Sequence, residues 1–118
     1  ERLLIGILPR EIHLKGHYES GLIELNGYLL DPTISQKIIN HSPDGFKWGY
    51  SGSGPNQLAL GILIKYLPIH LAIYIYREYA RAFISELDKK PLSGLYPFRE
   101  TIRVLILNKL YKKLETKF

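Results

Sequence analysis

The first third of the chain carries apolar residues in the spacing of β-strands. Residues 3–8 form a short apolar run, and apolar and polar residues alternate within 11–18, which is typical of a strand with one face in water. Residues 21–30 are predicted as a third strand. A hairpin turn at 19–21, in which Gly21 supplies a positive φ, is expected to join it to the second. This region therefore predicts an antiparallel meander of three or four strands.

Apolar residues later in the chain recur with helical spacing. Residues 55–67 are apolar on nearly every side, which is typical of a buried central helix, and Ser53 or Gly54 is expected to cap it. Residues 69–87 show the stripe of an amphipathic helix. Residues 100–117 predict an exposed amphipathic helix whose polar face is basic.

Shorter elements connect these segments. Thr33 or Ser35 is expected to cap a short helix that ends near Ile39. Residues 46–50 predict a short aromatic strand, and residues 92–98, punctuated by proline and glycine, predict a loop or a short strand.

Together these elements predict one α+β domain over residues 1–118. In it, an N-terminal antiparallel β-meander packs against a buried central helix and an amphipathic helix, with a C-terminal basic helix at the end. The apolar run 58–76 is about long enough to span a bilayer, but Lys65, Pro68 and His70 interrupt it. A charge and a helix breaker near the bilayer centre are costly, so no membrane span is expected.

Composition narrows the chemistry. The chain has no cysteine, which excludes disulfides, thiol nucleophiles and cysteine zinc sites. Residues 2–9 are too short an apolar run for a secretory signal, so a cytoplasmic location is expected. No carboxylate pattern accompanies the histidines, so we expect no metal, no cofactor and no catalytic set. The four histidines are His13, His17, His41 and His70.

A glycine-rich segment is the most distinctive part of the chain. The only tryptophan, four of the ten glycines and Pro55 stand directly before the buried helix. Uncapped N–H groups and the positive end of the helix dipole can hold a phosphate or carboxylate there, although a glycine turn can equally serve close packing alone. The candidate ligand-binding residues are Trp48, Tyr50, Ser51, Gly52, Ser53, Gly54, Asn56 and Gln57.

Aromatic side chains precede this turn. Phe46, Trp48 and Tyr50 have the same parity, so on a regular strand they share one face. They form either a core cluster or a surface on which one ring stacks against a base.

The net charge of +5 favours phosphate or acidic protein partners. Much of the excess lies in the C-terminal helix, which can follow a nucleic-acid backbone or simply be a solvated face. The alternative nucleic-acid-binding residues are Arg99, Arg103, Lys109, Lys112, Lys113 and Lys117.

Tyrosines on the amphipathic helix suggest association. Tyr74, Tyr76 and Tyr79, with the exposed side of residues 69–87, present more apolar surface than one small sheet covers. Symmetric dimers are the commonest outcome for such a surface, so a homo-oligomer is expected.

The segment around the glycine turn also resembles a known family. Residues 35–46, followed by Trp48-Gly49-Tyr50, Gly52-Ser53-Gly54-Pro55 and residues 57–63, resemble small domains of unknown function from bacteria, phages and other mobile elements. The chain departs from the family pattern at Ser51 and Gly61, and it carries Tyr96-Pro97-Phe98 where relatives have a tryptophan. The resemblance implies a small intracellular protein carried by a phage or plasmid.

Three function classes stay open. The first is a non-enzymatic sensor or sponge for a phosphate-bearing small molecule such as a nucleotide, acting in counter-defence. The second is an inhibitor that binds a host protein through the tyrosine-rich and basic surface. The third is an enzyme, which the sequence disfavours because no catalytic set is visible.

Overall fold

Three strands from the first third of the chain and one strand from its C-terminal part form a single antiparallel sheet. The computed structural model describes residues 2–116, and its strands lie in the order β3-β2-β1-β4. These strands are β1 (Glu11–His17), β2 (Leu22–Leu25), β3 (Tyr28–Leu29) and β4 (Leu92–Pro97). The α+β class and the N-terminal antiparallel meander are confirmed, and β4 comes from the segment for which the sequence predicts a loop or a short strand.

Alternation along β1 decides which face of the sheet is buried. Ile12 and Leu14 have no exposed surface, whereas their neighbours on the strand, such as His13 and Lys15, are exposed. In the antiparallel register Leu14 stands opposite Leu25 of β2 and opposite Gly94 of β4. The two-residue period of the sequence therefore places one apolar face of β1 toward the helices.

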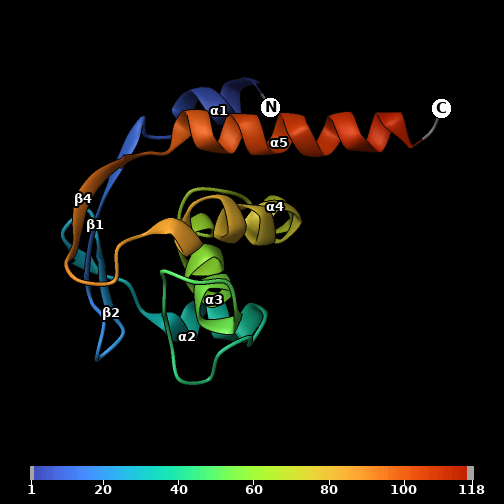
Figure 1. The fold of residues 1–118 in the computed structure, drawn as a ribbon. Helices are drawn as coiled ribbons and strands as arrows, with labels where there is room; N and C mark the ends of the chain where they lie inside the picture. The colour runs from blue at the N-terminus through green and yellow to red at the C-terminus, as the bar shows by residue number, and fades with distance from the viewer. Residues whose placement is uncertain (1, 117–118) are drawn as a thin grey trace.

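The helix α3 (Ser53–Leu63) is the centre of the core, as the sequence predicts. Nine of its eleven residues are buried. The helices α2 (Pro32–Ile38) and α4 (Ile69–Ala82) pack against it, and the sheet lies beyond it on the other side (Figure 1). A helix that is apolar all round needs such an enclosure, because no side of it can face water without cost.

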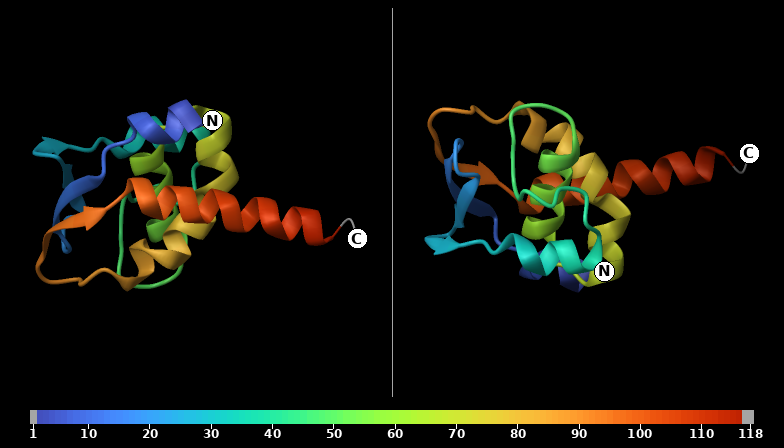
Figure 2. Two further views of the ribbon diagram at one scale, coloured as in Figure 1. Left: turned by 90° about the horizontal axis from the view of Figure 1, so that it is seen from above. Right: turned by 90° about the horizontal axis from the view of Figure 1, so that it is seen from below.

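The last helix, α5 (Arg99–Glu115), lies across the top of the body and extends beyond it in every view (Figures 1 and 2). It makes the molecule long, with extents of 47 × 26 × 24 Å. Beside its first half lies α1 (Arg2–Ile7), so the prediction of a strand at residues 3–8 is wrong. A short apolar run without alternation fits a helix as well as a strand. In the structure β4, and not residues 3–8, pairs with the edge of β1 that β2 leaves open.

Several local predictions are corrected by hydrogen bonding. Asp31 caps α2 by accepting a bond from the Thr33 N–H at 2.9 Å, in place of Thr33 or Ser35. The cap of α3 is Gly52, without a side-chain bond, in place of Ser53 or Gly54. Positive φ angles at Asn26 and Gly27 divide the predicted strand 21–30 into the β2–β3 hairpin.

Two further segments differ from expectation. Residues 46–50 form an irregular loop, and no strand bonds join them to the sheet. The helix expected over residues 69–87 ends at Ala82, and a 3-10 turn, η1 (Ile84–Glu86), follows it. Among residues 2–116, no helix is long and apolar enough to cross a bilayer.

The packing of β1 against the core yields a test at Gly16. A Cβ atom there would lie 2.8 Å from Trp48 Cζ2 and 2.9 Å from both Ile23 Cδ1 and Leu92 Cδ2. Because these neighbours belong to the packed core, we expect Gly16→Ala to lower the free energy of unfolding by about 1–3 kcal/mol in urea titrations. Gly6→Ala is the control, since nothing lies within 4 Å of its Cβ position. Equal stability of both variants would contradict this packing.

Candidate anion-binding site

The loop before α3 directs its aromatic residues in different directions. Phe46 and Trp48 are buried at 1% and 0% exposure, and the Trp48 indole N–H donates to the Asp88 carbonyl at 3.0 Å. Tyr18 packs edge-on against Trp48 at 5.2 Å between ring centroids. Tyr50 is instead 40% exposed. Two of the three rings therefore belong to the core, and only Tyr50 is available at the surface.

The predicted ligand residue Gln57 is a structural tie. Its side chain has no exposed surface, and its Oε1 accepts the N–H groups of His41 and Ser42 at 2.7 and 3.0 Å. Its Nε2 donates to Ser35 Oγ at 2.9 Å and to the Ile39 carbonyl at 3.1 Å. All four bonding positions join α3 to α2 and to the loop that follows it, so Gln57 has none left for a ligand.

A hollow of about 230 Å³ opens at the start of α3. It brings together three of the eight predicted ligand residues, Ser51, Gly52 and Asn56, with two arginines of α4. Ser53 is exposed and Gly54 is buried, and neither lines the hollow. Its complete lining is Ser51, Gly52, Pro55, Asn56, Arg77, Ala80 and Arg81.

Backbone donors at this end of α3 are fewer than the sequence suggested. The Asn56 N–H donates to the Gly52 carbonyl at 3.0 Å and so belongs to the helix. Pro55 has no N–H, and Gly52 has no side chain to cap the first turn. The amides of Ser53 and Gly54 are the positions that helix geometry leaves without an intrahelical partner. The positive end of the helix dipole lies there as well.

Arg77 and Arg81 give the hollow its positive charge. They are one turn apart on α4, and both are exposed. The Arg77 Nε donates to the Tyr76 hydroxyl at 3.0 Å, and this bond raises the pKa of Arg77. Two guanidinium groups beside a helix N-terminus are suited to a phosphate or carboxylate.

A hydrogen-bonded relay holds Arg77 in place. The Tyr76 hydroxyl accepts from Arg77 and lies in hydrogen-bond contact with His41 Nε2. The hydroxyl proton can therefore point to His41, whose Nε2 then acts as the acceptor. Burial lowers the pKa of His41, and the positive charge of Arg77 lowers it further, so both effects favour the neutral imidazole.

Sequence reasoning missed the two arginines. They lie more than twenty positions after the glycine turn, and nothing in the local pattern joins them to it. The available signal was their spacing of four on the polar side of an amphipathic helix, which predicts neighbouring side chains on one helix face.

The basic residues of α5 do not form one continuous patch. Arg99 Nε donates to the Leu8 carbonyl at 2.8 Å, Arg103 pairs with Glu100, and Lys109 pairs with Glu78 at 3.2 Å. Lys112 and Lys113 are exposed, and Lys117 lies outside the described residues. Whether this helix binds nucleic acid stays a prediction.

Tyrosines of α4 are mostly unavailable for association. Tyr76 and Tyr79 are buried at 2% and 0% exposure, and Tyr74 lies beneath Lys109, whose Nζ is 4.2 Å from the ring centroid.

Within residues 2–116, no three histidine or acidic side chains gather as they would around a metal ion.

Comparison with known proteins identifies the family. Residues 14–100 match the model of a family of unknown function, DUF6166, so the chain belongs to this family. The matched region includes the second half of β1, the other three strands, α2, α3, α4 and the glycine-rich loop before α3. Searches of the curated proteins and of the solved structures found no match.

The role of Gln57 can be measured directly. Gln57→Leu keeps the side-chain volume but leaves the N–H groups of His41 and Ser42 and the Ile39 carbonyl without their partner. We expect the free energy of unfolding to fall by about 2–4 kcal/mol, because buried polar groups left unpaired are costly. Gln36→Ala removes the hydrogen bond from the Gln36 side chain to the Ser42 carbonyl, and it should lower the free energy of unfolding by only about 1 kcal/mol. A neutral Gln57→Leu would show that these bonds are dispensable.

Proposed function

We propose that this protein is a non-enzymatic binding protein that holds a phosphate-bearing small molecule, nucleotide-like in size, in the hollow at the start of α3. The observation that carries the proposal is the convergence of Arg77 and Arg81 with Ser51, Gly52 and Asn56 around one open volume. Guanidinium groups pair with phosphate in two-point geometry, and the hydroxyl and amide side chains add adjustable partners.

The biological role is part of the same proposal. In this proposal the protein acts by sequestering its ligand, and the setting is the cytoplasm of a bacterial cell that carries a phage or other mobile element. There it would act as a counter-defence sponge for a nucleotide signal. The resemblance of the glycine-rich segment to domains of such elements supports this setting.

The proposal predicts specific stabilisation by phosphate. Inorganic phosphate and a nucleoside monophosphate should raise the melting temperature in a concentration-dependent way, because a ligand that binds only the folded state stabilises it. Arg81→Gln should weaken the affinity about tenfold, as expected for loss of a charge-assisted hydrogen bond.

The matched control is Lys113→Gln, which removes one positive charge from an exposed position of α5. It should leave phosphate affinity unchanged. An equal loss in both variants would mean that net charge, and not the hollow, attracts the anion. Absence of any stabilisation by phosphate or nucleotide would refute the proposed function.

A second proposal concerns self-association through α5. Its outer side exposes Val104, Leu107, Tyr111 and Leu114 at 41–69%, in the three- and four-residue spacing of a coiled-coil seam. At 3.6 residues per turn, Lys112 and Lys113 lie about 120–140° away from the centre of this row. Two copies can therefore pair along it without bringing these lysines together.

Light scattering at micromolar concentration tests this association. We expect a dimer mass for the natural protein and a monomer mass for Leu114→Glu, because a carboxylate in an apolar seam is poorly solvated. Tyr28→Glu, at a tyrosine of β3 that is 80% exposed, is the control and should stay dimeric. A monomer mass for the natural protein would remove the homo-oligomer and favour the alternative, a host protein bound by the same face.

A further inference from the structure

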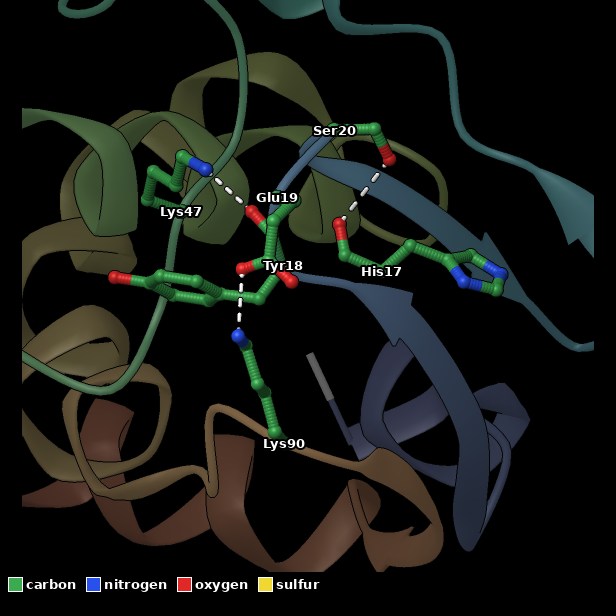
Figure 3. Close-up of polar contacts among 6 residues, drawn as sticks. All are labelled: His17, Tyr18, Glu19, Ser20, Lys47 and Lys90. Atoms are coloured by element: carbon green, nitrogen blue, oxygen red, sulfur yellow. Dashed lines mark hydrogen bonds and ion pairs between the residues drawn. The ribbon is translucent and has the colours of Figure 1, made fainter.

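A second basic hollow lies next to the proposed phosphate site. It has a volume of about 390 Å³ and is lined by the end of β1 and the following turn on one side and by Lys89, Lys90 and Pro91 on the other. Figure 3 shows Lys47 and Lys90 reaching the Tyr18–Glu19 segment from two sides. No residue of the first hollow is shared with it.

Tyr50 connects the two hollows. A Cβ atom on Gly52, which lines the first hollow, would be 3.0 Å from Tyr50 Cε2, so the tyrosine ring lies directly against this glycine. The centroid of the Tyr50 ring is also 5.6 Å from the Nζ of Lys89, and Lys89 lines the second hollow. The surface therefore runs from Gly52 over an exposed aromatic ring to Lys89.

The chain segments that carry these residues lie side by side. The Gly49 N–H donates to the Ile84 carbonyl at 3.0 Å, which fixes the glycine-rich loop along η1. A Cβ atom on Gly49 would lie 2.7 Å from Lys89 Cγ. Arg81 of α4 and Lys89 thus stand at the two ends of a segment that the loop follows, with Tyr50 between them.

We infer that the nucleotide-like group held in the first hollow is one unit of a short single strand of nucleic acid, which extends beyond the small molecule proposed above: one phosphate lies at Arg77 and Arg81, the adjoining base stacks on Tyr50, and the next phosphate lies at Lys89 and Lys90. This inference rests on the proposed function and adds the class of ligand. Alternating cations and an exposed aromatic ring are the elements with which proteins hold single strands without reading their sequence. A duplex would keep its bases stacked on one another and away from Tyr50.

The existing partners of the lysines do not block this role. Lys90 pairs with Glu19 at 2.9 Å, but both side chains are largely exposed, at 66% and 74%. An exposed ion pair contributes little free energy, so a phosphate can replace the carboxylate. The Nζ of Lys89 lies 5.5 and 5.6 Å from the ring centroids of Tyr18 and Tyr50, and at an exposed site such cation–π contacts contribute little free energy. Glu19 therefore competes with the strand for Lys90.

Fluorescence anisotropy with a labelled oligothymidylate of about ten nucleotides tests the inference. We expect the oligonucleotide to bind more tightly than thymidine monophosphate. Tyr50→Ala should weaken oligonucleotide binding about tenfold, and Tyr50→Phe should retain it, because stacking needs the ring and not the hydroxyl. Lys89→Gln should weaken binding and reduce the slope of affinity against salt by about one. Glu19→Gln should strengthen it by freeing Lys90.

Two controls separate this surface from other regions. Tyr28→Ala removes an exposed tyrosine at the β3 edge, and Lys113→Gln removes an exposed charge of α5, so both should leave oligonucleotide affinity unchanged. Inorganic phosphate should stabilise the Tyr50, Lys89 and Glu19 variants as it does the natural protein, which also shows that they fold.

The outcomes distinguish the inference from the proposed function. Oligonucleotide and monophosphate binding with equal affinity, or no effect of Tyr50→Ala and Lys89→Gln, would overturn the single-strand ligand and leave the phosphate site standing. Loss of oligonucleotide binding only in Lys113→Gln would move the contact to α5 and also overturn it. Failure of phosphate and nucleotide to stabilise any form of the protein would refute the proposed function itself.

Discussion

The enclosure of α3 is the constraint on which the rest of the structure depends. Nine of its eleven residues are buried, so the sheet, α2, α4 and the glycine-rich loop all have to cover it. One buried residue, Gln57, is polar, and its amide must be paired inside the core. Its four bonds bring α2 and the segment 39–42 against α3. Burial of an apolar helix thus also determines the path of the loop that leads to the hollow.

Elements with a clear period could be predicted from the sequence. The alternation around Ile12 and Leu14 identified β1 and its buried face, and the continuous apolar pattern identified α3 as the central helix. Both predictions rest on burial, which a local pattern records directly. The apolar run that became α1 lacked a period. Whether this run forms a helix or a strand depends on its contact with α5, where Arg99 donates a hydrogen bond to the Leu8 carbonyl. A local sequence pattern does not contain that contact.

The candidate site was only half visible in the sequence. Glycines before a helix indicate an exposed N-terminus, and Ser51, Gly52 and Asn56 do line the hollow. The burial of Trp48 and Gln57 depends on partners far along the chain, at Asp88 and at Ser35. The positive charge at the site comes from Arg77 and Arg81 of a different helix, α4. Such pairings follow from the topology and not from the spacing of residues within one segment.

The position of Trp48 has a spectroscopic consequence. It is the only tryptophan of the chain, its ring is fully buried, and it is held between Tyr18 and the carbonyl of Asp88. Tyr18 and Asp88 adjoin the lysines around the second hollow, and the residues that follow Trp48 lead into the first. The wavelength and intensity of its emission therefore report on this one loop and not on an average over the molecule. The natural protein thus carries an intrinsic fluorophore in the loop that leads to the first hollow.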